Sequence, residues 1–449
     1  MLFRSDQNSR DIRELFIGQD TQVRSLLLSN LVRDDRGRCR TLDLWWTPLP
    51  GLQTLILLAK ERSRGIFTVN FDQPFPSLHH LGLQHVGSWA GRGAPNLTKF
   101  VLRSCGSAMS YSQFFDFLAG TPRLQCLRVE HCQAMLYDVP AARKLAMTCL
   151  SQISTIAYPP PLVEQLLRHL QPASYVSVLV QDHVEDNNLG SLDSYFNGVH
   201  VFEPFNSTCT LAVTILEDWG HGTSPDWCDL VLTFHSETFT ATLWFHDIQS
   251  HTVVSRVPPI LGTLLASCNI TEVWCGAEAP LMITDEGDAL TQFLIHKLPD
   301  VTTFGLSGSA FDEDRVDTFS PPICLIRSTL GHDTDTSNPI IAPTVQELRI
   351  AAKPDGGPLN LERLQKFLEM RKSAGSPLAR VLLQQCDAYQ QCVPELSELV
   401  DEVLLVNEDT FASSMHLAYD HVSSALYRRY PGPVCPKDCG SCALKLGQW

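Results

Sequence analysis

Three cysteines near the end of the chain have a spacing that could bind a metal ion. Cys435, Cys439 and Cys442 follow the pattern C-x3-C-x2-C. A structural zinc site needs four ligands, so this cluster would need one more, for which His421 or a residue elsewhere in the chain could serve. Because the ligand set is incomplete, we interpret the tail as unstructured and assign no metal ligand and no cofactor. A metal-binding or redox protein that uses these cysteines is the alternative function.

An acidic loop and a histidine between glycines could also do chemistry, but a solvated loop without a chemical role is the stronger interpretation for each. An acidic loop could hold a divalent cation, yet its spacing lacks the glycine and the terminal glutamate of a calcium loop. Its carboxylates belong to Asp312, Glu313, Asp314, Asp317, Asp333 and Asp335. His221 stands between two glycines and has no serine, cysteine or carboxylate at a catalytic spacing. We therefore predict no catalytic residue and a protein that is not an enzyme, with a hydrolase acting through His221 as a remote alternative.

The strongest pattern in the chain is a repeated apolar triplet with the spacing L-x-x-L-x-L. It occurs at Leu78-Leu81-Leu83, at Leu97-Phe100-Leu102 and at Leu124-Leu127-Val129. The last two triplets are followed by Cys105 and Cys132, as in leucine-rich repeats. We predict a strand at each triplet, because alternate side chains of a strand point to one face. Both cysteines are interpreted as small buried residues with a weak S–H donor.

Helices are predicted between some of these strands. Ser110 can cap a helix over residues 111–118 that ends near Gly120, and the run Pro159-Pro160-Pro161 opens another over residues 162–170. A third is predicted from Leu361 to Ser373, and further strands at 209–216, 230–234, 239–245, 378–383 and 400–405. The predicted fold class is therefore α/β, an irregular leucine-rich-repeat-like solenoid with a strand-rich central segment.

Changes in the pattern along the chain predict four segments. Residues 1–172 form an N-terminal repeat block and residues 173–256 an irregular strand-rich segment. Residues 257–410 form a C-terminal repeat block, and residues 411–449 a helix and the cysteine-containing tail.

Composition and charge narrow the classes of partner. The chain has 449 residues, of which 34 are basic and 49 acidic, giving a net charge of −15. Such a charge repels phosphate backbones, so we predict no nucleic-acid partner. No apolar run approaches the roughly 18 residues of a membrane span, so no membrane partner is predicted either. Charged residues near Met1 and 15 scattered cysteines favour an intracellular protein of cytoplasm or nucleus with reduced thiols.

Several of these stretches together resemble a known family. They are Pro95-Asn96-Leu97-Thr98-Lys99-Phe100, Thr121-Pro122-Arg123-Leu124, and the helix 361–373 leading into Pro377-Leu378 and Cys386. Over roughly residues 10–410 the chain resembles the leucine-rich-repeat region of the large F-box-like protein family of mushroom-forming fungi. The resemblance implies an adaptor, in which an F-box binds the Skp subunit of a cullin ubiquitin ligase and the repeats bind a target. The F-box itself is not seen ahead of the repeats. Leu49-Pro50 is the stretch most similar to the L-P dipeptide near which an F-box begins.

The function predicted from the pattern is non-enzymatic binding of another protein. Residues that alternate with the buried triplet positions should point outward and form the binding surface. The predicted partner-binding residues are His80, Gln84, Lys99, Arg103, Arg128, Glu130, Arg380 and Gln384.

Overall fold

We describe the fold from a computed structural model of the chain. The structure describes residues 2–4, 23–31, 41–43, 50–59, 68–71, 75–91, 94–105, 109–132, 144–172, 175–183, 209–217, 227–237, 239–249, 269–277, 300–308, 344–350, 361–373, 375–384 and 390–406. The chain divides into two compact units. Unit 1 comprises Met1–Asp182, Asn197–Phe202 and Cys435–Trp449, and unit 2 comprises His183–Phe196 and Glu203–Val434.

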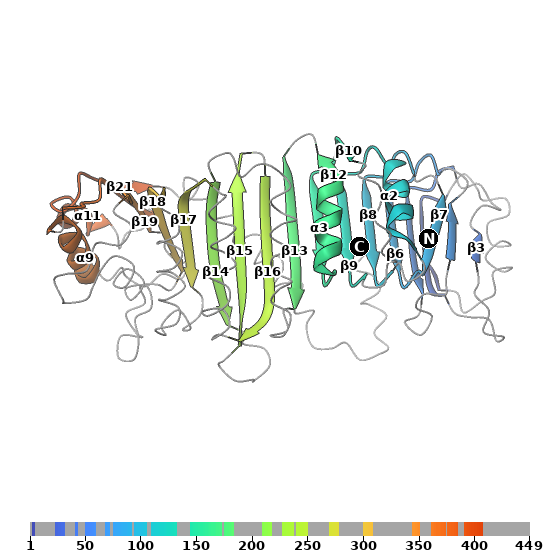
Figure 1. The fold of residues 1–449 in the computed structure, drawn as a ribbon, viewed down its shortest axis with the longest axis horizontal. Helices are drawn as coiled ribbons and strands as arrows, with labels where there is room; N and C mark the ends of the chain where they lie inside the picture. Colours follow the sequence, from blue (N-terminus) through green and yellow to red (C-terminus); the bar gives the residue numbers. More distant parts are fainter. Residues whose placement is uncertain are drawn as a thin grey trace. The chain divides into compact units, whose positions relative to one another are not determined.

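The main sheet of unit 1 is parallel in every pair whose register is defined. Its strands lie in the order β1-β2-β4-β6-β8-β9-β11-β13 (Figure 1). Their bounds are β1 Leu2–Arg4, β2 Ser25–Leu31, β4 Thr54–Ala59, β6 His80–Gln84, β8 Lys99–Arg103, β9 Cys126–Glu130, β11 Gln152–Ile156 and β13 Val176–His183. The three apolar triplets predicted from the sequence form β6, β8 and β9, which pair in register. Those strand predictions are confirmed.

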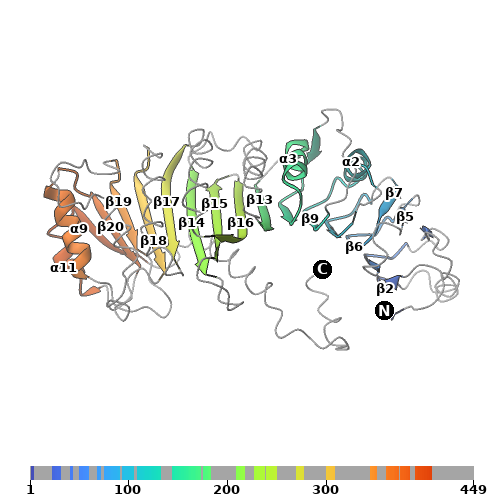
Figure 2. The same cartoon turned by 60° about the horizontal axis from the view of Figure 1, so that its bottom comes forward.

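A second layer covers one face of this sheet. It contains the parallel strands β3 Thr41–Asp43, β5 Thr68–Phe71 and β7 Ser88–Gly91, and the pair β10 Leu145–Met147 and β12 Leu170–Pro172. It also contains helices α2 Tyr111–Ala119 and α3 Pro160–His169, which lie over the same face in both views (Figures 1 and 2). Both predicted helices of this region are therefore confirmed.

Helix α2 begins with a complete capping box and packs its aromatic face onto the sheet. The side chain of Ser110 accepts a hydrogen bond from the Gln113 backbone, and the Gln113 side chain accepts one from Ser110 in return. Phe117 of α2 lies 5.1 Å from Phe100 of β8, measured between ring centroids. This contact shows that Phe100 points toward the helices. Alternation along β8 then places Lys99, Val101 and Arg103 on the opposite face.

Four strands of unit 1 end in the same unusual conformation. The residue after each has a positive φ: His85 (56°), Ser104 (50°), His131 (52°) and Ala157 (45°). Each donates its backbone N–H to the next strand, as Ser104 does to the Glu130 carbonyl at 2.7 Å. The following residues, Val86, Cys105, Cys132 and Tyr158, are buried. The left-handed residue therefore turns the chain off the sheet and returns the next side chain to the core.

Ala157 gives a direct test of this strand end. Left-handed backbone costs a residue with a Cβ about 1–2 kcal/mol, whereas glycine adopts it freely. Ala157→Gly is therefore expected to raise the free energy of unfolding by about 0.5–1 kcal/mol, measured by urea denaturation. The matched control is Ala146→Gly at an exposed position of β10, which should lower it. Destabilisation by Ala157→Gly would contradict the strained conformation.

Unit 2 contains a mixed sheet. Its strands lie in the order β16-β15-β14-β17-β18-β19-β20-β21. Their bounds are β14 Cys209–Glu217, β15 Trp227–Ser236, β16 Phe239–Gln249, β17 Ile270–Ala277, β18 Thr303–Gly308, β19 Glu347–Ile350, β20 Arg380–Gln384 and β21 Glu402–Val406. The β14–β15 and β15–β16 pairs are antiparallel, and the pairs from β14–β17 to β20–β21 are parallel. The described helices of this unit are α9 Leu361–Ser373 and α11 Val393–Leu396.

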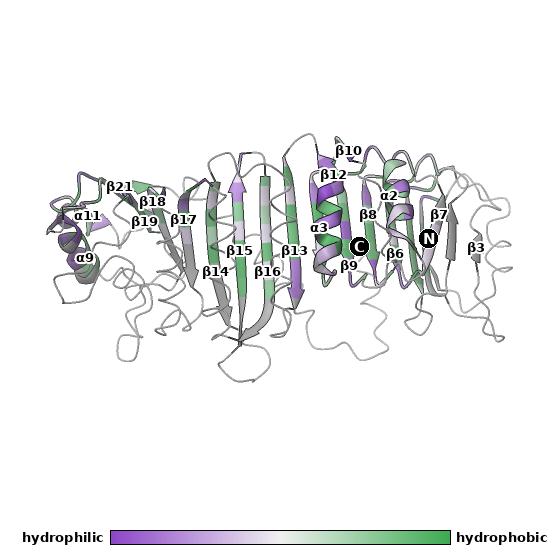
Figure 3. Ribbon diagram, in the orientation of Figure 1, coloured by the Kyte–Doolittle hydropathy of each residue, from purple (hydrophilic) through white to green (hydrophobic). Residues whose placement is uncertain are grey.

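Hydropathy follows the burial of these elements. Figure 3 shows hydrophobic and hydrophilic stripes on α3. Leu162, Val163, Leu166 and Leu167 are its buried hydrophobic positions, and Arg168 is exposed. An amphipathic helix of this kind is stabilised by burial of one face rather than by intrinsic propensity.

The predicted fold class, an α/β leucine-rich-repeat-like solenoid, is wrong. The described residues form a large, mostly parallel and partly mixed β-structure with few helices, which is not an evident solenoid. The triplet spacing reflects the alternation of a buried parallel strand and does not specify the segment that leads to the next strand. In the described part of unit 1, the short strands β3, β5 and β7 follow β2, β4 and β6 along the chain and pair with one another in a separate sheet. The strands predicted in the centre are present, as the antiparallel β14–β16.

The two cysteines of the triplet pattern are buried, as predicted. Cys105 Sγ lies 3.2 Å from the Leu83 carbonyl, and the Cys105 backbone N–H donates to Cys132 Sγ at 3.3 Å. Burial raises the pKa of Cys105 to about 12 and that of Cys132 well above its usual value. Both thiols therefore stay protonated at neutral pH and act as packing groups. The cysteine cluster 435–442, His421, His221 and the acidic loop lie outside the described residues.

Candidate protein-binding surface

The outward rows of the unit 1 sheet are the candidate functional site. We call the face opposite α2 the far face. Side chains on it alternate with the buried leucines, and the parallel register aligns them across the strands. One row runs Thr54, His80, Lys99, Cys126, Gln152 and Ser177, and another runs Leu58, Gln84, Arg103, Glu130, Ile156 and Gln181. The far face thus presents polar and charged groups from six neighbouring strands.

The structure brings six of the eight predicted partner-binding residues together. His80 pairs in register with Lys99, and Gln84 with Arg103. Arg103 in turn pairs with Glu130, while Arg128 pairs with Val101. The remaining two, Arg380 and Gln384, lie on β20 of unit 2. The predicted set is therefore divided between two surfaces that we describe separately.

Glu130 holds the two arginines of the far face in place. Its carboxylate is almost fully buried, and Arg103 Nε donates to its Oε2 at 2.5 Å. Arg128 Nε forms an ion pair with Oε1 without hydrogen-bond geometry. The Arg103 side chain is 36% exposed and the Arg128 side chain 18%. A buried carboxylate needs such partners, because removing one would leave an uncompensated charge.

The imidazole of His80 is neutral at physiological pH in its position on the far face. Burial, with a smaller contribution from the charge of Lys99, lowers the pKa of His80 to about 4. We expect its NMR titration midpoint near pH 4, and a partial rise in that midpoint in Lys99→Met. Since the folded-state pKa is below the unfolded one, unfolding takes up a proton, and stability should fall as pH drops from about 6.5 to 4. A wild-type midpoint near 6.5 would contradict this environment.

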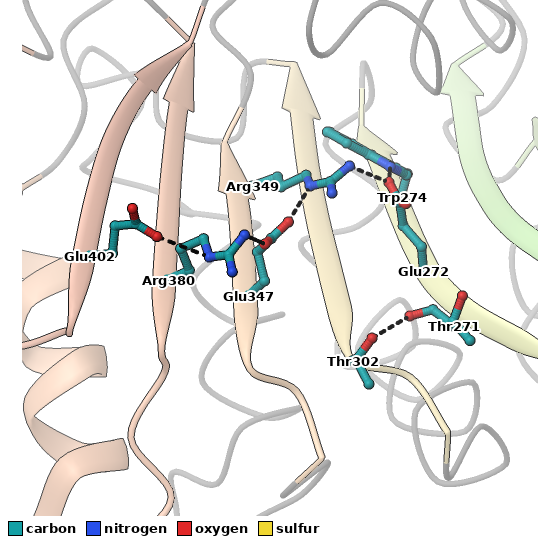
Figure 4. A network of polar contacts seen from close by, with 8 residues as sticks. All are labelled: Thr271, Glu272, Trp274, Thr302, Glu347, Arg349, Arg380 and Glu402. Atoms are coloured by element: carbon teal, nitrogen blue, oxygen red, sulfur yellow. Dashed lines mark hydrogen bonds and ion pairs between the residues drawn. The ribbon is translucent and has the colours of Figure 1, made fainter.

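Unit 2 carries a ladder of alternating charges across four of its parallel strands. Arg349 Nη1 lies 3.0 Å from Glu272 Oε1, and Arg349 Nε lies 2.6 Å from Glu347 Oε1 (Figure 4). Arg380 continues it, with contacts of 3.2 Å to Glu347 and 3.1 Å to Glu402. Arg380 and Glu402 are half exposed, so their pair contributes little to stability. The inner pairs are more buried and hold β17 and β19 in register.

Trp274 closes the inner end of this ladder. Its Nε1 donates a hydrogen bond to Glu272 Oε1, and the indole is buried. Trp274 pairs in register with Gly305 of β18. A Cβ built on Gly305 would lie 2.2 Å from Trp274 Cδ2, so the indole lies directly against the glycine backbone. The missing side chain at residue 305 makes room for the ring.

Sequence reasoning found Arg380 but missed the rest of the ladder. Glu347 and Arg349 flank the buried Leu348 at alternate positions, and Glu272 and Trp274 flank Val273 in the same way. That alternation could have identified these residues as outward-facing from the sequence. The ion pair between Arg349 and Glu272 could not be identified in this way, because the two residues are separated by 77 positions.

The described residues contain one pairing that resembles a base and a nucleophile. His235 Nδ1 lies 2.8 Å from Thr240 Oγ1, but Thr240 is fully buried and no substrate can reach its hydroxyl. Burial lowers the pKa of His235. Within the described ranges there is no group of three or more histidine, cysteine or acidic side chains that could hold a metal ion. None of the helices described is long and apolar enough to cross a membrane.

Comparison with known proteins gives no match. No family model fits the chain, and neither a curated protein nor a solved structure matches it.

Proposed function

We propose that this protein binds another protein through the far face of unit 1 and catalyses no reaction itself. The observation that supports the proposal is the contrast between the two faces of one sheet. Leu81, Phe100 and Leu127 on the helix side have no exposed surface. The two outer rows of the opposite face carry mostly polar and charged side chains, and Gln152 and Arg103 on them reach solvent. The row between them includes the buried Ile56 and Val101. A rigid sheet that presents such rows is suited to recognition by shape and polar contacts.

The resemblance to the fungal F-box-like family extends this proposal. On that resemblance, the bound protein would be a target presented to a ubiquitin ligase through a Skp subunit and a cullin. Binding by the far face does not require this attachment, so the two parts of the proposal are tested by separate readouts.

The test is affinity capture of the tagged protein from its own cells, followed by mass spectrometry. The test variant is Gln152→Trp on the far face, and the control is Gln171→Trp on β12, since both glutamines are exposed. We expect Gln152→Trp, but not Gln171→Trp, to lose a defined set of captured proteins. Equal recovery with both variants and the unmodified chain would overturn far-face binding. Recovery of a Skp subunit and a cullin with the unmodified chain would support the adaptor role, and their absence would leave a free-standing binding module.

A further inference from the structure

The far face carries a charge opposite to that of the whole chain. From β4 to β13, its ionised side chains at neutral pH are Lys99, Arg103, Arg128 and Glu130. Three cations and one carboxylate give 3 − 1 = +2, whereas the chain has a net charge of −15. We call Lys99, Arg103 and Arg128 the basic cluster. A local positive field on an acidic protein attracts anionic groups.

The cations are regularly spaced along the strand direction. Lys99 and Arg103 are four residues apart on β8, which corresponds to about 13 Å. Arg128 of β9 is in register with Val101, midway between them. The basic cluster therefore advances in steps of about 6.6 Å, equal to two residues of an extended chain.

We propose that the basic cluster binds an extended acidic segment of the protein partner, with carboxylates at alternate positions. This inference rests on the proposed function and names the chemistry of the partner at the same surface. In an extended peptide, residues i, i+2 and i+4 point to one side, so three carboxylates meet Lys99, Arg128 and Arg103 in turn. A guanidinium can bond to more than one carboxylate, so pairing with Glu130 does not prevent a second contact.

Fluorescence anisotropy of labelled peptides with the purified full chain tests the proposal. The probe has three glutamates at alternate positions, separated by serines. Two comparison peptides have either glutamine in place of the three glutamates or the three glutamates at consecutive positions. A third comparison probe is a single-stranded oligothymidylate. We expect the alternating acidic probe to bind most tightly and its affinity to fall with added salt. Equal binding of the glutamine peptide or of the consecutive glutamates, or tighter binding of the oligonucleotide, would overturn the proposal.

Two single substitutions test the surface in opposite directions. Lys99→Gln should weaken binding of the alternating probe about threefold to fivefold, the range of a partly exposed ion pair. Glu130→Gln keeps the size of the side chain, removes the one carboxylate that the described strands β4 to β13 place on the far face, and should strengthen binding by a similar factor. Lys144→Gln and Arg168→Gln are matched controls, because both are exposed residues outside the far face. An effect of Lys99→Gln no larger than that of the controls would overturn the proposal.

Failure of this inference is distinguishable from failure of the proposed function. If Gln152→Trp abolishes capture of a partner while Lys99→Gln leaves both capture and probe binding unchanged, far-face binding stands and the acidic segment is wrong. If neither substitution changes the captured proteins, the proposed function itself fails.

Discussion

Gly305→Ala is expected to destabilise unit 2 by about 3 kcal/mol, at the upper end of the usual cost of overpacking. The added methyl would lie 2.2 Å, 2.3 Å and 2.6 Å from Cδ2, Cε3 and Cε2 of the Trp274 indole. These atoms belong to a rigid, buried ring, so they cannot withdraw as the end of a flexible side chain would. Urea denaturation followed by circular dichroism measures the loss, and hydrogen exchange of β18 peptides localises it.

A double-mutant cycle separates this clash from a general intolerance of β18. Trp274→Ala alone should cost about 3–5 kcal/mol, as for other buried tryptophans. In that background Gly305→Ala should cost almost nothing, because the ring is gone and alanine suits a strand better than glycine. The coupling energy between the two residues should therefore be about 3 kcal/mol. An equal cost of Gly305→Ala in both backgrounds would show that the indole is not the cause.

The sequence predicted the local elements well because their signals are local. The triplet 97–102 predicted β8, since the alternation of a half-buried strand is visible within six residues. Ser110 and the aromatic residues after it predicted α2, because a cap and one apolar face suffice to define a helix. The helix Leu361–Ser373 was predicted with the bounds that the structure shows.

What the sequence did not reveal depends on contacts between distant segments. Nothing local says that β5 pairs with β3 and β7 in a second layer, because that pairing joins segments distant in the sequence. The left-handed residues after the strands also escaped prediction. His85, Ser104, His131 and Ala157 occupy a conformation whose usual signal is glycine. They are held there by the hydrogen bond that each backbone N–H donates to a carbonyl of the neighbouring strand, which is a tertiary interaction.

On the candidate surface, too, local features could be predicted from the sequence and contacts between strands could not. The outward direction of Lys99 and Arg103 followed from alternation with Phe100, so the residues could be named from the sequence. The burial of Glu130 between two arginines could not be predicted from the sequence, because it depends on the register of β8 with β9. Likewise, only the structure shows that the Trp274 indole lies against the backbone of Gly305, because this contact depends on the register of β17 with β18.

Arg371→Met should have the second large effect on stability, about 3 kcal/mol. Arg371 lies in the last turn of α9 and is 1% exposed. Its Nε donates to the Ser376 carbonyl at 2.9 Å, and its Nη2 donates to the Val345 carbonyl at 2.9 Å. One guanidinium thus joins the end of α9 to the turn after it and to the start of β19. Methionine fills the same space but leaves both carbonyls without this donor, and each lost charge-assisted bond costs about 1.5–3 kcal/mol.

The control for Arg371→Met is Lys372→Met, the next residue along α9. Lys372 is exposed and makes one hydrogen bond, from Nζ to the Glu398 carbonyl at 3.0 Å, so its loss should cost under about 1 kcal/mol. Arg371→Lys keeps a cation but cannot span two carbonyls with a planar fork, and it should recover less than half of the stability. Urea denaturation of the three variants measures these differences. Full stability in Arg371→Lys would mean that the charge alone, and not the bridge between α9 and β19, is what unit 2 needs.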